Sequence, residues 1–462
     1  MTEFLKTGLT GIRTVFGGGN TDGDAWIDTA SATTTPREAL IQQVAKWQLW
    51  AAIIHALAAL ILGIVLFAAP NTGENLGNTL FSVASGIPGQ ALLLTIVGIL
   101  ANMTALLLLA VATMAQEVWT WPFLVLIVIL NGLILFTWGF LPAILTLVSL
   151  IYPTTLMLRD VRAWHANPVS TKELRGRMRG VRAFAIITIF LVLMSAFTLL
   201  LYLVQLPAVT GGRTIITGEL GRLLFIGVVG VELVLVIFIV PALTAGAISG
   251  ERERKTYDLL QTTLLSAPMF MVGKMESALG YIVLLLASAI PLQSIAFLFG
   301  GVGETEVIIA FVVLMVTGLV LGALGLFYSA QTERTLTSTV RVYTVALVLC
   351  FGLPIVGAIL FNNAYGNAIS GLPALATSSP VRETLAIYGD MLIVSLNPIT
   401  ASFYTQQMLI DHQQIGVLQV QLASNGATIP VLSPWLLLTL IYLAVTAVLI
   451  LLSIRRMRRN VL

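Results

Sequence analysis

The strongest constraint on this chain is a succession of apolar runs, each long enough to cross a bilayer. A helix of about 20 apolar residues spans the ~30 Å hydrocarbon core. Continuous runs of this length argue against the short alternating strands of a β-barrel. Only 10% of the residues are charged, 58% are hydrophobic, and the mean hydropathy is +0.97. We therefore expect an all-α, polytopic helical membrane protein with about ten transmembrane helices. The runs fall at roughly 47–69, 91–115, 122–139, 141–157, 183–204, 223–248, 277–299, 307–328, 342–361 and 434–454.

One part of this map allows two interpretations. The segment 122–158 is almost continuously apolar and too long for one ordinary span. Its middle, "FTWGFLP", contains Gly139 and Pro142, which favour a tight turn between two short helices. A single long kinked helix is the alternative, and it would leave nine spans instead of ten.

The basic residues orient the predicted helices. With ten spans, all but three of the 24 lysines and arginines lie on one side, the exceptions being Arg213, Arg222 and Arg382. The positive-inside rule places that side in the cytoplasm. We expect both termini there, in a prokaryotic-type plasma (inner) membrane. With nine spans, only the N-terminus would move to the other side.

The spans and their connections divide the chain into parts. The first 16 residues place apolar side chains at helical spacing, which suits an interfacial amphipathic helix, although a frayed terminus is equally compatible. Short apolar patches in the long outer segment suit interfacial helices or a folded cap. The expected parts are a cytoplasmic tail (1–46), a four-span N-terminal part (47–157), a basic cytoplasmic linker (158–182), and a six-span unit (183–462) that contains the extracytoplasmic segment 362–433.

The segment 250–266, "GERERKTYDLLQTTLLS", gathers both signs of charge in a chain that has little of either. Basic residues at the end of a span can simply anchor it to phospholipid headgroups. Glu251 and Glu253 would weaken such an anchor, so this explanation is incomplete. A helix over 251–266 would pair Glu251 with Lys255 and end at Pro268. Its apolar stripe would contain Tyr257, Leu260 and Leu264, as in a short helix that docks on another protein.

This segment resembles the cytoplasmic signature of type-2 ABC-exporter permeases: Glu-x-Glu, then Thr, Leu-Leu, Thr and Ser. The resemblance covers about residues 183–454, including the six-span count and the long outer segment before the last span. Two positions differ from the family pattern, with Lys255 where glycine is common and Leu264 where proline is common. The residues that carry the signature are Glu251, Arg252, Glu253, Thr256, Leu259, Leu260, Thr263 and Ser266.

The resemblance implies a short cytoplasmic coupling helix that docks on a separate ABC-type ATP-binding subunit. It also implies a second permease copy or a related permease, because one six-span unit encloses half of a pathway. The chain itself has no G-x-x-x-x-G-K-[ST] motif, since "MVGKM" at 271–275 lacks the first glycine and the hydroxyl. We therefore expect ATP and Mg²⁺ to bind the partner, no cofactor to bind this chain, and no enzyme activity in it.

Other chemistry finds little support in the sequence. Cys350 is the single cysteine, and the three histidines are far apart, so we expect neither catalytic residues nor a metal site. Neutral polar residues within the spans, including His55, Asn102, Asn131 and Gln293, suit contacts between helices. A positive segment beside a span is ordinary topology, so we expect membrane lipid and no nucleic acid as a partner.

Glu232 carries the main alternative. A carboxylate within a span is costly to insert, and therefore faces a bundle interior, a cavity or a partner. It is a candidate for an ion- or proton-coupled pathway in a secondary transporter, and a protonated structural residue is equally compatible. A third possibility is a non-transporting assembly subunit in which the first four spans recruit a partner. The sequence does not identify a substrate.

Overall fold

The computed structural model describes most of the chain. Residues 1–35 of the N-terminal tail, including the expected amphipathic helix at 1–16, lie outside the described residues, and residues 36–46 already belong to the first helix. By its internal contacts the chain divides into residues 1–43, of which only 36–43 are described, and residues 44–462. The described residues are 36–68, 70–80, 90–159, 164, 166–179, 181–210, 217–257, 266–361, 363–369 and 380–459.

Helices dominate these residues, and nine helical stretches among them are long and apolar enough to cross a membrane. The chain is thus a multi-pass, all-α membrane protein, as the apolar runs predict. The long helices are α3 (Pro36–Ala68), α5 (Gln90–Ala115), α6 (Thr120–Trp138), α9 (Val181–Thr210), α10 (Thr217–Thr244) with α11 (Ser249–Glu253), α13 (Ala267–Leu298), α14 (Glu304–Gln331), α15 (Thr335–Leu347) with η2 (Val348–Gly352) and α16 (Leu353–Phe361), and α20 (Pro434–Arg459).

The apolar segment 122–158 is two helices, as the turn signal predicts. Helix α6 ends at Trp138, and Gly139 follows in the left-handed conformation with φ of 61°. Its N–H donates to Leu135 O at 3.0 Å, which closes the helix. Helix α7 (Pro142–Arg159) then begins at a proline, a residue suited to a first helical turn. The prediction of a single kinked helix is therefore wrong. Helix α7 is also apolar, but it is shorter than the nine helices given above.

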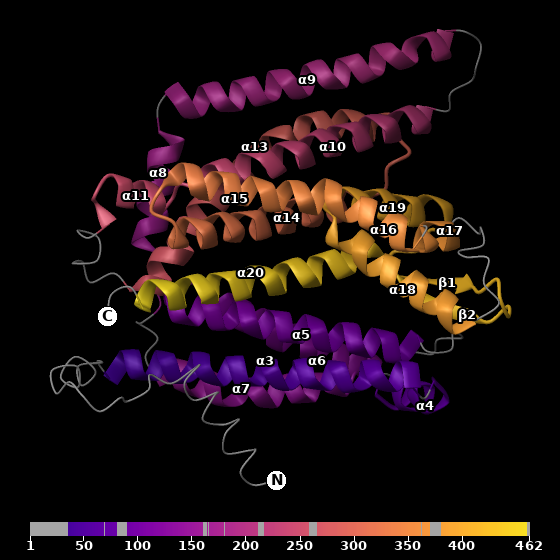
Figure 1. Cartoon of the computed structure of the whole chain (residues 1–462), viewed down its shortest axis with the longest axis horizontal. Helices are drawn as coiled ribbons and strands as arrows, with labels where there is room; N and C mark the ends of the chain where they lie inside the picture. The colour runs from indigo at the N-terminus through magenta and orange to yellow at the C-terminus, as the bar shows by residue number, and fades with distance from the viewer. Residues whose placement is uncertain are drawn as a thin grey trace. The chain divides into compact units, whose positions relative to one another are not determined.

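Helix α14 lies at the centre of the C-terminal helices and packs most extensively against α10 and α20. Figure 1 shows α20 between α14 and α5, so it also contacts the N-terminal helices. Buried apolar side chains fill this contact region, among them Val240, Leu314, Leu321 and Tyr442. Close packing of spans in this way depends on complementary shape more than on the hydrophobic effect.

The N-terminal spans are joined by two buried polar contacts. Asn102 and Asn131 donate to each other's side-chain oxygens at 2.9 and 3.0 Å, connecting α5 to α6. His55 contacts Thr146 at 2.9 Å and its own helix at Ala51 O, connecting α3 to α7. These residues therefore make the interhelical contacts that the sequence predicts for them.

The segment between α16 and α20 supplies most of a hydrophobic core to which Leu93 of α5 also contributes. It contains α17 (Ala364–Ile369), α18 (Pro380–Leu396), α19 (Pro398–Asp411), and a hairpin of β1 (Val417–Gln421) and β2 (Thr428–Leu432). Tyr365 is fully buried and donates from its hydroxyl to Leu432 O at 2.9 Å. Helices α18 and α19 meet at a bend of 117°, so the pair doubles back. The hairpin was not predicted from the sequence.

Asn397 occupies that bend and connects it to a second irregularity. Its side-chain nitrogen donates to Leu349 O and Cys350 O at 3.0 and 2.6 Å. Both carbonyls belong to η2, the π-helical stretch between α15 and α16. Its side-chain oxygen accepts from Ile399 N and Thr400 N, which caps α19. One buried amide thus satisfies backbone groups from two interrupted helices.

Candidate functional site

The segment that follows α10 is fixed to α14 by its backbone. Turn residues 245–248 lead into α11, and Ile248 N and Ser249 N each donate to Ser329 Oγ at 2.9 Å. Ser249 and Ser329 are both fully buried. The entry to the candidate coupling segment is therefore attached to the end of the central helix.

Helix α11 is much shorter than the expected helix over 251–266. It ends at Glu253, and Lys255 has φ of 56°, in the left-handed region. Lys255 N donates to Arg252 O and Thr256 N donates to Glu251 O, both at 2.9 Å. This is the hydrogen-bond pattern of a Schellman C-cap, which terminates a helix. The prediction of one continuous helix, with Glu251 paired to Lys255, is wrong because the backbone reverses at Lys255.

Glu251 instead pairs with a lysine on the next span. Lys274 on α13 is 6% exposed, and its Nζ lies 2.5 Å from Glu251 Oε1. The same ammonium forms an ion pair with Glu173 of α8 (Pro168–Met178). Two carboxylates from separate segments thus neutralise one buried cation, as a buried charge requires. Lys274 connects α8, α11 and α13.

Glu253 makes a different connection, to the start of α15. Its carboxylate accepts from Thr335 N at 2.8 Å and from Thr335 Oγ1 at 2.9 Å. Thr335 is the first residue of α15, where unpaired N–H groups and the helix dipole favour an anion. The two acids of the Glu-x-Glu motif therefore contact two different helices.

Arg252, between the two acids, contacts the connection from α14 to α15. Its Nη1 donates to Thr332 O at 3.3 Å, and its guanidinium lies 4.9 Å from the centre of the Tyr257 ring. Tyr257 is buried among apolar residues of α13, α14 and α20. Arg252 therefore contacts both the connection from α14 to α15 and Tyr257, the residue that follows the reversal.

The remaining signature residues are only partly described. Thr256 is exposed and donates from its hydroxyl to Glu251 O at 3.2 Å. Ser266 caps the start of α13 by accepting from Met269 N at 3.4 Å, and Pro268 lies in the first turn of that helix. Pro268 thus begins the next span instead of ending the coupling helix. Leu259, Leu260 and Thr263 lie outside the described residues, as does Leu264.

Two acids without a predicted role, Glu117 and Glu276, lie close to this site. Glu117, in the turn between α5 and α6, is 1% exposed and accepts from Asn167 Nδ2 at 2.6 Å. The same Asn167 amide donates to Met269 O at 2.7 Å, and Glu276 of α13 accepts from Trp119 Nε1 at 2.8 Å. Burial raises the pKa of Glu117 to about 7. The hydrogen bond from Asn167 lowers this pKa in part, and the neighbouring Glu276 carboxyl raises it further. This turn is therefore joined to both α8 and α13.

A weak signal for these residues was present in the sequence. Lys274 and Glu276 interrupt an otherwise apolar stretch of α13, and Glu117 interrupts the connection between two spans. Ionisable residues in such places normally have a buried partner. Their partners lie on helices distant in the sequence, so the pairs could not be assigned without the structure.

Glu232 lies on α10, separate from the acids of α11. It is fully buried, and Gln293 Nε2 of α13 donates to both of its carboxylate oxygens, at 3.0 and 2.8 Å. Among the described residues, Gln293 is the side chain that bonds to this carboxylate. The pair joins two neighbouring spans through polar groups inside the bundle.

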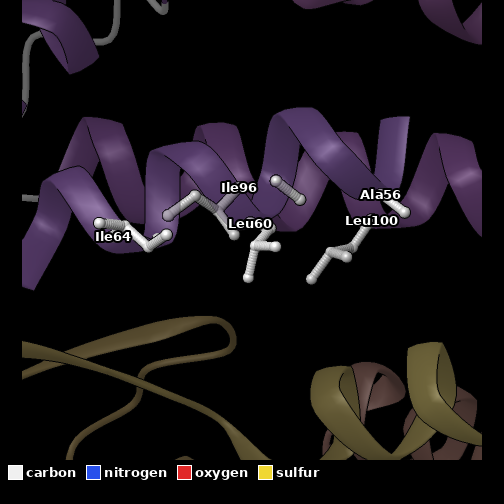
Figure 2. Close-up of a pocket in the computed structure, with 7 residues that line it drawn as sticks. Ala56, Leu60, Ile64, Ile96 and Leu100 are labelled. Carbon is white, nitrogen blue, oxygen red and sulfur yellow. The ribbon is translucent and has the colours of Figure 1, made fainter. Parts of the chain in front are cut away.

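The described residues offer neither a metal site nor a polar ligand pocket. No group of three or more histidine, cysteine, aspartate or glutamate side chains in the described part of the chain could hold a metal ion. An open groove along α3 and α5 is apolar throughout and has no polar group to orient a hydrophilic ligand (Figure 2). Its walls are Ala56, Ala59, Leu60, Gly63, Ile64, Ile96 and Leu100.

Compared with models of known protein families and with curated proteins, the chain matches none of them.

Proposed function

We propose that this membrane protein is the permease subunit of an ATP-driven exporter, coupled to a separate ATP-binding subunit through the segment at 250–268. The observation that carries the proposal is the double attachment of the Glu-x-Glu motif. Glu251 binds Lys274 of α13, and Glu253 binds the first residue of α15. A force applied to this segment would therefore reach two further spans directly.

The backbone anchorage supports the same role. Ser329 of α14 holds the backbone N–H groups of Ile248 and Ser249, so the segment is also attached to the central helix. A coupling element has to move together with the spans it drives, since a flexible loop would absorb the partner's movement. The contacts to α13, α14 and α15 meet this requirement.

Lys255 bears on the resemblance to type-2 ABC-exporter permeases. It stands where glycine is common in that family, and its φ of 56° is a conformation that glycine adopts without steric cost. Lys255 therefore differs from the family pattern in residue type, while its backbone conformation is one that the usual glycine would also adopt. This agreement favours the family assignment over a simple lipid anchor.

The proposal is tested by copurification from gently solubilised native membranes. The wild-type chain should retain a soluble ATPase in about stoichiometric amount, detected by mass spectrometry. Charge reversal of the exposed pair, Arg254→Glu with Lys255→Glu, should remove that ATPase and leave the internal contacts of Glu251 and Glu253 in place.

A matched control reverses two exposed arginines elsewhere, Arg341→Glu with Arg456→Glu, and should keep the ATPase. Absence of any ATPase from the wild-type preparation, with the protein intact, would contradict the proposal. Equal loss in both double variants would show a general charge effect and would also contradict it.

Glu232 supports a second candidate, an ion- or proton-coupled secondary transporter. The favouring observation is its complete burial with a neutral amide as partner, since an acid in this setting can exchange a proton. Transport that needs a proton gradient, and loses that need in Glu232→Gln, would favour this candidate. Transport that needs ATP and is unchanged in Glu232→Gln would favour the exporter.

A further inference from the structure

Helix α8 runs crosswise to the spans, at the end of the bundle where α13 begins (Figure 1). It packs mainly against α13 and contacts α9 at its own C-terminal end. Figure 1 shows this crosswise direction most clearly against α9. A helix in this position lies near the level at which spans leave the hydrocarbon and meet lipid headgroups.

The charges of α8 are sorted by face. Glu173 and Arg177 form an ion pair at 3.7 Å, and both have side chains that are only 22% exposed. Arg177 also donates to Leu243 O of α10 at 3.5 Å, and Glu173 binds Lys274 of α13. One positive and one negative side chain thus face the protein. Glu173 is thus paired with a group on α13, and Arg177 with a group on α10.

The charged side chains on the opposite side of α8 are all positive. Lys172 and Arg175 are three residues apart, so they share one face of the helix, and Arg179 follows at its C-cap. All three side chains are exposed. Glu173, the acid of this helix, is held on the other face by Lys274. The exposed cations are therefore not neutralised from within α8.

Large apolar side chains follow immediately. Val181 and Phe184, at the start of α9, are 83% and 74% exposed. An anionic phospholipid presents the complementary pair of features, a negative headgroup and a hydrocarbon chain attached to it. A soluble polyanion would use the cations and leave Val181 and Phe184 without a partner. The order of charges and apolar residues therefore favours a lipid.

We propose that Lys172, Arg175 and Arg179 bind the headgroup of an anionic phospholipid whose acyl chain lies along Val181 and Phe184. The assignment is independent of the transport function, since it rests on α8 and the first turn of α9. It differs from ordinary charge bias beside a span because it locates the lipid at one set of cations.

Retention of lipid by the purified protein tests this assignment. The protein is exchanged into mixed phosphatidylglycerol and phosphatidylcholine, and retained lipids are counted by native mass spectrometry. The wild type should prefer phosphatidylglycerol. The variant Lys172→Gln, Arg175→Gln and Arg179→Gln should lose about tenfold or more of that preference, because each surface cation contributes about fivefold.

The matched control removes three exposed cations from three other helices, Lys46→Gln, Arg341→Gln and Arg456→Gln. It should keep the wild-type preference. Equal loss in both triple variants, or no loss in the α8 variant, would overturn the proposal. A soluble phosphate source is distinguished by adding inorganic phosphate, and displacement of the lipid at millimolar phosphate would show an anion site without lipid selectivity and overturn it.

A measurement on the wild type covers the case in which the α8 variant fails to fold. Phosphatidylglycerol with a photoreactive acyl chain should label the peptide that contains Val181 and Phe184 more strongly than equally labelled phosphatidylcholine does. High salt should reduce that difference, because exposed ion pairs are screened. Equal labelling by both lipids at low salt would overturn the proposal.

Discussion

Glu251 and Lys274 form an ion pair with 2.5 Å between Oε1 and Nζ, across the junction between α11 and α13. The lysine is nearly buried and also pairs with Glu173, which in turn pairs with Arg177, so two cations and two carboxylates meet here. Such an arrangement is most sensitive to loss of the lysine, because Glu251 then loses its cation, whereas loss of either acid leaves Lys274 with the other acid. The junction therefore depends on the lysine more than on either acid.

Lys274→Met should destabilise the protein by about 1–3 kcal/mol, since the partly buried Glu251 would lose its cationic partner and Glu173 would keep only Arg177. Thermal unfolding in a zwitterionic detergent measures this change. Adding Glu251→Gln to Lys274→Met should restore part of the loss. Lys172→Met, at an exposed position, should change stability by less than about 0.5 kcal/mol. No difference between the two lysine variants would contradict a structural role for the pair.

Lys255→Gly should leave stability unchanged or raise it by up to about 1 kcal/mol. Glycine removes the steric cost of a positive φ and adds freedom to the unfolded chain, so the two effects partly cancel. Lys255→Val should destabilise by about 1–2 kcal/mol, because a β-branched residue fits the left-handed region poorly. The free energy of unfolding of both variants is compared. Similar losses for glycine and valine would mean that the helix does not end in this conformation.

Glu117 should make stability depend on pH. Its pKa is raised from 4.5 to about 7, so between these values the folded state keeps a proton that the unfolded state releases. Stability should therefore fall as pH rises from about 4.5 to about 7, by at most about 3 kcal/mol, and then level off. Unfolding temperatures measured from pH 5 to pH 8 follow this change.

Glu117→Gln is the matching variant, because a glutamine oxygen still accepts from Asn167 and does not titrate. It should flatten that part of the pH profile. The exposed Glu304→Gln should retain the wild-type profile. A Glu117→Gln profile parallel to the wild type would assign the pH dependence to other groups.

Asn397→Leu should destabilise by about 2–4 kcal/mol, because the amide makes four hydrogen bonds to backbone groups of η2 and α19. Asn397→Asp retains the oxygen that caps α19 but sets a carboxylate oxygen against Leu349 O and Cys350 O, so its loss should be at least as large as that of Asn397→Leu. Unfolding in detergent ranks the three proteins. A smaller loss for aspartate than for leucine would contradict a donor role of the Asn397 amide toward η2.

The spans could be predicted from the sequence because membrane insertion imposes a long apolar run on each of them. The turn at Gly139 was also predictable, since glycine and proline mark it locally. The hairpin of β1 and β2 was not predicted, because its strands are five residues each and packed under helices from elsewhere in the chain. The bend at Asn397 likewise depends on carbonyls of η2, nearly 50 residues earlier.

The candidate site was predicted in part. The Glu-x-Glu motif drew attention to Glu251 and Glu253, but local spacing suggested Lys255 as a partner, whereas the partners are Lys274 and Thr335. A helical i,i+4 rule assumes that the helix continues, and the reversal at Lys255 removes that condition. Glu117 was missed because its burial comes from helices that meet only in the folded protein.

The short helix α7 has a consequence for the surrounding bilayer. Its apolar part, Pro142–Leu158, is roughly 25 Å long at 1.5 Å per residue. A typical hydrocarbon core is ~30 Å thick, so lipids next to α7 would have to compress or tilt to match it. The neighbouring α5 has 26 residues and imposes no such demand. Hydrophobic mismatch would therefore be confined to the flank of the protein that contains α7. The energetic cost of that mismatch would be lowest where the membrane is locally thin.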